Sequence, residues 1–169
     1  MRGAVVWITG RPSAGKSTLA RRLAESLRVR RCACLVLDGD EVRATLVPQK
    51  GYSPQDRDDF YATLSHLAVL AARQGLIVIV AATAHKRTYR ESCRRAAPRF
   101  FEIFVDASPE EVVDRDPKGL YRDAKLGTVT NLPGLDLAYE PPLHPECVAS
   151  GGEDQEALRR LFELLESAS

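Results

Sequence analysis

The sequence lacks an excess of either charge, since 24 basic side chains are balanced by 23 acidic ones and the formal net charge is +1. Non-specific nucleic-acid binding requires many phosphates to be neutralised by lysine and arginine, so this balance gives it no support. No apolar stretch approaches the roughly 18 residues that a transmembrane helix needs, and the first predicted strand begins within a few residues of Met1. We therefore expect a cytoplasmic protein with no signal peptide, no membrane partner and no nucleic-acid partner.

Cysteine is sparse, with four residues in the chain, and their spacing does not match a metal site. Cys32 and Cys34 are two positions apart, whereas Cys93 and Cys147 stand alone. Zinc sites need closely spaced cysteine pairs together with a second pair or with histidines. Reduced cysteines that pack in the interior explain this pattern better. The 169 residues are enough for a single domain, 1–169, whose core needs no disulfides.

Apolar runs alternate with helical patterns along the whole chain, which is typical of an α/β fold with helices on both faces of a parallel sheet. We expect a three-layer α/β/α domain with five strands, at 4–9, 32–37, 76–81, 101–105 and 147–149. Helices are expected at 18–27, 41–46, 54–74 and 88–97, from Ser108 onward, and around 158–165. Ser53 and Pro54 form a helix start, and Ser108 with Glu111 forms a capping box.

The stretch from 116 to 142 has a different character from the rest of the chain. Its apolar periodicity fades, while proline, glycine and charged residues accumulate. Loops of this length in compact domains are usually functional or disordered. We therefore expect an excursion over the surface, whose lysine and arginine residues give it a reason to close as a lid over a bound anionic ligand.

The string Gly10-Arg11-Pro12-Ser13-Ala14-Gly15-Lys16-Ser17 follows an apolar run and precedes a helical pattern. Strand, glycine-rich loop and helix in this order predict a phosphate-binding loop that holds a nucleoside triphosphate. Backbone amides and the helix N-terminus would surround the phosphates, Lys16 would reach the outer phosphates, and Ser17 would bind Mg²⁺. The residues expected to bind the nucleotide are Gly10, Ser13, Ala14, Gly15, Lys16, Ser17 and Thr18.

Several other nucleotide-dependent classes lack support in the sequence. The guanine-reading Asn-Lys-x-Asp of GTPases is absent, and the third strand ends in Ala81-Ala82-Thr83-Ala84 without the acid that motor ATPases carry there. The acids lie after the second strand instead, as Asp38-Gly39-Asp40. Carboxyl ends of parallel strands meet at one edge, so these acids should face the phosphate-binding loop. One carboxylate can accept a proton while the other holds Mg²⁺ through water, which suits phosphoryl transfer to a hydroxylated acceptor.

Four segments together resemble the adenylylsulfate kinase family, and the resemblance extends over nearly the whole chain. They are Asp38-Gly39-Asp40-Glu41-Val42-Arg43, Gly51-Tyr52-Ser53-Pro54-Gln55-Asp56-Arg57, Asp116-Pro117-Lys118-Gly119-Leu120-Tyr121, and Gly134-Leu135-Asp136 with Tyr139-Glu140-Pro141-Pro142. The family has a P-loop kinase fold and transfers the γ-phosphoryl group of ATP to the 3′-hydroxyl of adenosine 5′-phosphosulfate. The resemblance therefore implies ATP with Mg²⁺, a small anionic acceptor, a role in sulfate assimilation and, for the assembly, a homodimer.

The resemblance also implies roles for particular residues. Asp38 and Lys16 would be catalytic, with Asp38 meeting the 3′-hydroxyl. Arg43 and Arg57 would hold the phosphosulfate, and Tyr52 would stack on the substrate adenine. The remaining residues implied on the acceptor side are Asp40, Lys118 of the lid and Leu132.

The departures from the family lie on the acceptor side. Phe60 and Ala62 stand where the family has asparagine and arginine, and Leu132 stands in place of a stacking phenylalanine. The serine-rich segment after the third strand is replaced by Thr83-Ala84-His85-Lys86-Arg87. Two alternatives therefore stay open: a kinase of another anionic hydroxyl compound, such as a nucleotide conjugate or sugar derivative, and a non-catalytic nucleotide-binding module. The latter predicts loss of the catalytic set, which is retained.

Two smaller questions concern basic residues. His85 and Lys86 follow a central strand, and two interpretations of them stay open: contact with the acceptor, and a solvated loop. The arginines after them are spaced mostly as a solvated helix face, and we expect them to be exposed. They are Arg87, Arg90, Arg94, Arg95 and Arg99.

Overall fold

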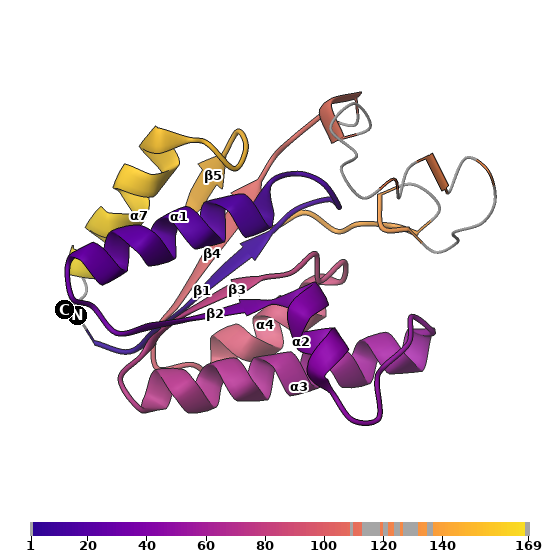
Figure 1. Cartoon of the computed structure of the whole chain (residues 1–169), viewed down its shortest axis with the longest axis horizontal. Coiled ribbons are helices and arrows are strands. Elements are labelled where there is room, and N and C mark those ends of the chain that lie inside the picture. The colour runs from indigo at the N-terminus through magenta and orange to yellow at the C-terminus, as the bar shows by residue number, and fades with distance from the viewer. Residues whose placement is uncertain are drawn as a thin grey trace.

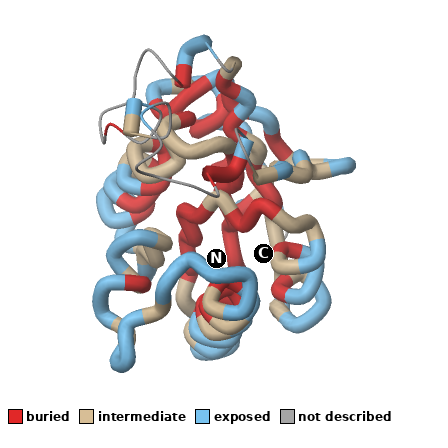
Figure 2. Tube along the Cα trace, turned by 90° about the vertical axis from the view of Figure 1, so that its right-hand side faces the viewer, coloured by how far each residue is buried: buried red, intermediate tan, exposed pale blue. Residues whose placement is uncertain are grey.

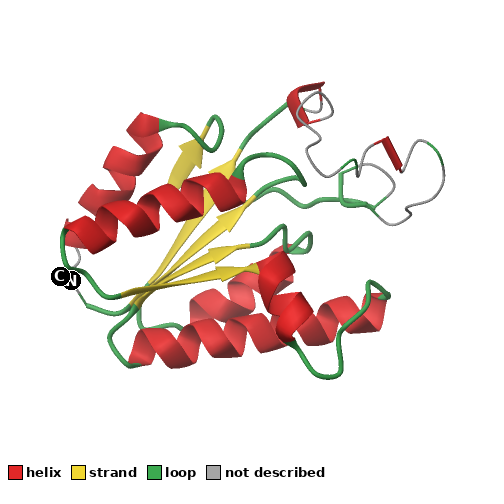
Figure 3. Ribbon diagram, in the orientation of Figure 1, coloured by secondary structure: helices red, strands yellow, loops and turns green. Residues whose placement is uncertain are grey.

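Five parallel strands form one sheet in the computed structural model, which describes residues 2–108, 110–112, 119, 122–123, 126, 132–134 and 137–167. The strands are β1 (Ala4–Thr9), β2 (Cys34–Asp38), β3 (Ile77–Ala81), β4 (Phe100–Val105) and β5 (Cys147–Ala149). Their spatial order is β2-β3-β1-β4-β5, and each neighbouring pair is parallel. The predicted parallel sheet is confirmed (Figure 3).

Helices cover both faces of this sheet. They are α1 (Lys16–Val29), α2 (Gly39–Thr45), α3 (Pro54–Arg73), α4 (Arg87–Ala96) and α7 (Gln155–Ser167). As Figure 1 shows, α1 and α7 lie on one face, whereas α2, α3 and α4 lie on the other. The three-layer α/β/α expectation is therefore confirmed.

The two apolar cores share the central strand β1. Val6 and Ile8 pack in the core beneath α1 and α7, whereas Val5 and Trp7 pack in the core beside α3 and α4. Side chains of a strand alternate between the faces, and a strand covered on both faces must be apolar at every position. The run from Ala4 to Thr9 is accordingly fully buried. Figure 2 shows the buried residues, in red, gathered in the interior of the molecule.

Some boundaries differ from the predicted ones for local reasons. Helix α2 begins at Gly39, earlier than expected, because the Asp38 carboxylate caps it by accepting a hydrogen bond from the Asp40 amide at 3.0 Å. Strand β2 begins at Cys34, two residues later than expected. The predicted cap at Ser53 is confirmed, since its hydroxyl accepts from the Asp56 amide at 3.1 Å.

Ser108 and Glu111 form the predicted capping box. The Ser108 amide donates to the Glu111 carboxylate at 2.8 Å, and the Glu111 amide donates to the Ser108 hydroxyl at 3.2 Å. All four cysteines are free thiols, as expected. In the part of the chain that the structure describes, no three acidic, histidine or cysteine side chains gather as a metal site. None of the helices with described residues is long and apolar enough to cross a membrane.

Candidate active site

A cavity of about 1050 Å³ opens beyond the carboxyl ends of β2 and β3, beside the start of α1. Ligands of open parallel sheets bind at this edge, so the cavity is the candidate active site. The residues of the predicted site that line it are Ser13, Gly15, Lys16, Ser17, Thr18, Asp38, Asp40, Arg43, Tyr52, Arg57 and Leu132. The structure thus brings residues from four distant segments of the chain to one cavity.

The loop between β1 and α1 has the backbone that phosphate binding requires. Gly15 has a φ of 103° and directly precedes α1, whose first turn has no side-chain cap. A Cβ atom on Gly15 would lie 2.5 Å from the Gly152 nitrogen, so only glycine fits. The uncapped amides of the first turn of α1 and its dipole favour an anion at this position.

Lys16 adds a positive charge to the same loop. Its ammonium group donates to the Arg11 carbonyl at 2.7 Å, which keeps the side chain over the loop. Gly10 and Ala14 are not among the lining residues, and they serve the shape of the loop instead. A Cβ on Gly10 would lie 2.6 Å from the Val105 carbonyl oxygen, and Ala14 is completely buried.

Asp38 joins the loop to the end of β2. The Ser17 hydroxyl donates a short hydrogen bond to Oδ2 of Asp38, while Oδ1 accepts the amide of Asp40. One carboxylate therefore caps α2 and also faces the first turn of α1. Because Ser17 and Asp38 together offer hydroxyl and carboxylate oxygens to the cavity, they have the donor chemistry that Mg²⁺ prefers.

Two buried arginines face the acceptor side of the cavity. Arg43 is 5% exposed and donates to the Gly51 carbonyl at 2.5 Å, and Arg57 is 7% exposed and donates to the Tyr52 carbonyl at 3.0 Å. Aromatic rings flank them: the Arg43 guanidinium carbon lies 3.7 Å from the ring centre of Phe60 and 4.6 Å from that of Tyr52. Burial lowers the pKa of Arg43 below its ordinary value. An anion would restore the solvation this guanidinium has lost.

The positions that depart from the family separate into two groups. Phe60 and Leu132 line the cavity, so their side chains help to shape the acceptor pocket. Ala62 is exposed on α3 and Ala84 is fully buried, and neither lines the cavity. Lys118 lies outside the described residues, as does much of the predicted lid from 116 to 142.

His85 and Lys86 also lie away from the cavity lining. Lys86 donates to the Asp58 carboxylate of α3 at 2.8 Å. His85 is 4% exposed, and its Nδ1 has no hydrogen-bond partner within the described chain. Burial lowers the pKa of His85 to about 4, and the positive charges of Arg57 and Lys86 act in the same direction. His85 is therefore neutral at physiological pH.

Several lining residues were not predicted from the sequence, and Tyr61, Thr83, Gly152 and Glu153 are among them. Tyr61 follows Phe60 on α3, and its hydroxyl accepts the Ala84 amide at 3.1 Å. Its spacing of four from Arg57 placed it on the same helix face, which is the signal that could have indicated it. Thr83, Gly152 and Glu153 follow the ends of β3 and β5, where the strand-end rule could have indicated them.

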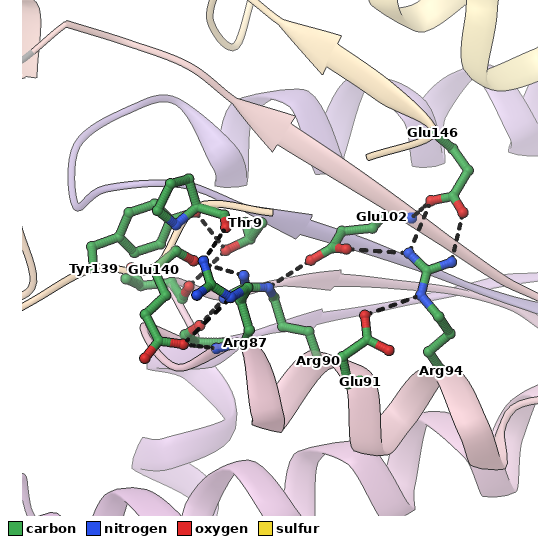
Figure 4. Close-up of polar contacts among 12 residues, drawn as sticks. Thr9, Arg87, Arg90, Glu91, Arg94, Glu102, Tyr139, Glu140 and Glu146 are labelled. Carbon is green, nitrogen blue, oxygen red and sulfur yellow. Dashed lines mark hydrogen bonds and ion pairs between the residues drawn. The ribbon is translucent and has the colours of Figure 1, made fainter. Parts of the chain in front are cut away.

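The expectation that the arginines of α4 form a solvated face is wrong for Arg90. This residue is 1% exposed and its Nε donates to the Glu102 carboxylate of β4 at 2.6 Å. Arg94 bridges Glu102 and Glu146 in the same network, at 3.2 Å and 2.6 Å (Figure 4). A helix period cannot show these partners, because they lie on β4 and before β5. A glutamate inside the apolar run of β4 was the available signal.

The same network holds the chain that returns after residue 137. Arg90 donates to the Glu140 carbonyl at 2.7 Å, and the Glu140 carboxylate accepts the first amide of α4, that of Arg87, at 2.8 Å. The Tyr139 hydroxyl lies 3.0 Å from the hydroxyl of Thr9, the last residue of β1 (Figure 4). The Tyr-Glu-Pro-Pro string thus fixes the return of the chain next to the phosphate-binding loop.

Comparison with known proteins places this geometry in one family. The family described as Adenylylsulphate kinase matches residues 2–150. The adenylyl-sulfate kinase of Picosynechococcus sp. is 39% identical over 97% of this chain and 94% of its own length. A probable bifunctional SAT/APS kinase 2 of Sorangium cellulosum is 40% identical over 98% of this chain, which spans only 29% of that longer protein.

A solved structure agrees in fold as well as in sequence. The Mycobacterium tuberculosis APS kinase CysC, in complex with AMPPNP and APS, is 35% identical and superimposes with a TM-score of 0.91. The superposition covers 98% of each chain. The two chains therefore share one fold over nearly their whole lengths. The chain belongs to the adenylylsulphate kinase family.

Proposed function

We infer that this chain transfers the γ-phosphoryl group of ATP to the 3′-hydroxyl of adenosine 5′-phosphosulfate (APS). The observation that carries the inference is the contact between Ser17 and Asp38 in a cavity that Arg43 and Arg57 also line. A nucleotide site near Ser17 and an anion site near Arg43 and Arg57 would then share one cavity, which Asp38 also lines. The likeness to a kinase solved with a nucleotide analogue and APS supports this assignment.

The residues divide the reaction between them. The acceptor oxygen attacks the γ-phosphorus, the bond to the β-phosphate oxygen breaks, and ADP leaves. Asp38 takes the hydroxyl proton, while Lys16 neutralises charge that develops on the transferred group. Arg43 and Arg57 hold the phosphosulfate, and Tyr52 and Leu132 flank the adenine. Phosphoryl transfer depends mainly on such positioning and charge neutralisation.

We propose that Mg²⁺ accompanies ATP in this site. Ser17 offers a hydroxyl oxygen at the first turn of α1, and a cation that keeps several waters and binds substrate phosphates needs few protein ligands. Asp40, exposed at the cavity rim, would hold ordered water of the same ion. When bound, the ion supplies neutralisation of the β- and γ-phosphate charge.

Three expectations from the sequence complete the proposal: a single domain with 116–142 as lid, a cytoplasmic location, and self-association as a homodimer. Leu132 and Pro133 line the cavity, which supports a role of that segment at the acceptor. The Thiobacillus denitrificans APS kinase, 27% identical, is described as hexameric, so at least one relative assembles. Light scattering on the purified protein measures the oligomeric state directly.

The activity is tested with purified protein, ATP, Mg²⁺ and a panel of acceptors. APS should be converted to its 3′-phosphorylated product, identified by mass spectrometry, with one ADP released per product. Nucleotide conjugates and sugar derivatives form the rest of the panel, because Phe60 and Leu132 alter the acceptor wall. Faster phosphorylation of one of these compounds would show that the pocket serves another acceptor, and no phosphorylation of any would contradict the kinase assignment.

A further inference from the structure

Arg43 is the most completely enclosed cation of the cavity, yet only part of its hydrogen-bonding capacity is used. Its Nη1 donates to the carbonyls of Gly51, at 2.5 Å, and Lys50, at 3.4 Å. A guanidinium carries five N–H donors. Within the described residues Arg43 has no further hydrogen bond and no ion pair with a carboxylate. Its Nε and Nη2 therefore remain for a ligand in the cavity.

Phe60 supplies the main support for this guanidinium from the side. The 3.7 Å from the guanidinium carbon to the ring centre puts the cation against the ring. Phe60 is only 2% exposed, and an edge-to-face contact with Tyr61 at 5.2 Å fixes its ring further. Tyr52, the other ring near Arg43, is 57% exposed and offers a less fixed support.

We propose that Phe60 is a positioning residue, whose ring holds Arg43 in the orientation that binds the phosphosulfate of the acceptor. This inference rests on the proposed function and identifies what determines acceptor binding at that site. In place of the asparagine of the family, this chain uses a ring that cannot hydrogen-bond the substrate. Phe60 acts instead through Arg43.

The physical argument is one of preorganisation. An arginine side chain has several rotatable bonds, and binding must otherwise freeze them at the moment the anion arrives. The carbonyl of Gly51 holds one nitrogen and the Phe60 ring packs against the guanidinium, so a residue that lines the cavity is already held in place when the anion arrives. A cation that burial has stripped of water also gains more from a ring face than an exposed one. Because the anion is held equally before and during transfer, the effect should appear in KM rather than in kcat.

The central experiment replaces Phe60 by methionine, which fills much of the same space but has no ring. The KM for APS should rise about tenfold, while kcat and the KM for ATP change by less than about twofold. Phe60→Tyr keeps the ring and should stay close to the unmodified protein. An unchanged KM for APS in Phe60→Met, or an equal loss in Phe60→Tyr, would overturn the proposal.

A double-mutant cycle tests whether Phe60 acts through Arg43. Arg43→Gln should raise the KM for APS on its own, and adding Phe60→Met to it should cause no further rise. The same rise in both backgrounds would contradict the proposed route. Phe162→Met is the matched control, because the Phe162 ring lies 4.1 Å from the Arg30 guanidinium carbon, is 8% exposed and does not line the cavity. It should leave the KM for APS unchanged.

A binding measurement separates this proposal from the proposed function. Inorganic sulfate, titrated into ¹⁵N-labelled protein, should shift the Nε–Hε resonance of Arg43, with about tenfold weaker binding in Phe60→Met. This readout needs no turnover, so it holds even if the unmodified protein fails to phosphorylate APS. No shift at Arg43, or equal sulfate affinity in both proteins, would overturn the positioning role. If Phe60→Met does not fold, Phe60→Leu takes its place in both measurements.

Discussion

In the described part of the chain, arginines are wholly or partly withdrawn from solvent in two regions, and the two regions accommodate them in opposite ways. At α4, Arg90 and Arg94 are neutralised by Glu102 and Glu146, and the hydrogen bonds to Glu146 raise the pKa of Arg94. In the cavity, Arg43 is held by carbonyl oxygens and a ring, and burial lowers its pKa. An arginine whose charge the fold already balances serves the fold, whereas one held without a carboxylate keeps its charge for a ligand.

The largest effect is expected from Lys16→Ala, which tests whether a cation that lines the cavity serves a ligand rather than the fold. Lys16 lines the cavity at the first turn of α1, and the Arg11 carbonyl holds its ammonium group over the phosphate-binding loop, so its charge is assigned to the nucleotide. We expect kcat to fall by about 10³-fold or more, with the midpoint of thermal unfolding unchanged. Stopped assays of ADP release with calorimetry measure both quantities. Full activity would remove the nucleotide-site assignment.

Asp38→Asn tests the acid at the centre of the cavity. A positioned proton acceptor contributes about 10²–10⁴-fold, so kcat should fall within that range while ATP affinity is nearly unchanged. Equilibrium binding of ATP alongside steady-state kinetics gives both numbers. Lost nucleotide affinity at unchanged kcat would instead assign Asp38 to the metal.

Arg90→Met should show the reverse behaviour, with a loss of stability rather than of affinity. It leaves the 3%-exposed Glu102 without its buried partner, which should lower the free energy of unfolding by about 3–5 kcal/mol. Urea denaturation measures the loss. Adding Glu102→Leu should recover most of it, and an unaffected stability of Arg90→Met would break the comparison.

His85 extends the comparison to a buried side chain that has no charge to balance, because it stays neutral at physiological pH. Its folded pKa of about 4 lies below the unfolded value near 6.5, so the unfolded state binds more protons between them. The free energy of unfolding should fall by up to about 3 kcal/mol as the pH drops from 6.5 to 4. His85→Gln should flatten this slope, and the exposed His66→Gln should retain it. Chemical denaturation at several pH values gives the profile.

The fold could be predicted because its signals are local. The run 76–81 is apolar throughout, Ser53 and Ser108 begin helices, and Gly15 precedes the first one. The predicted ends of helices and strands differ from the observed ones where one side chain has two roles. The helix expected from residue 41 begins at Gly39, because Asp38 caps it.

Site residues could be predicted where they directly follow a strand. Contacts could not be predicted where the two partners lie far apart in the sequence. The phosphate-binding loop and Asp38 lie directly after β1 and β2, so their meeting follows from topology. Arg90 is neutralised by the Glu102 carboxylate and also donates to the Glu140 carbonyl, and no local pattern connects either residue to α4. The stacking of Arg43 on Phe60 likewise needs the angle between α2 and α3, which is a tertiary property.

The two oxygens of Asp38 have separate partners, and this limits how the position can evolve. Serine or threonine could cap α2 in its place but would remove the charge beside Ser17. Glutamate would keep the charge but is a poor cap, so the short helix carrying Arg43 would lose its anchor. Substitutions of Asp38 should therefore score poorly both in a mutational survey of expression and in one of turnover. Expression would fall through the loss of the cap made by Oδ1, and turnover through the loss of Oδ2 beside Ser17.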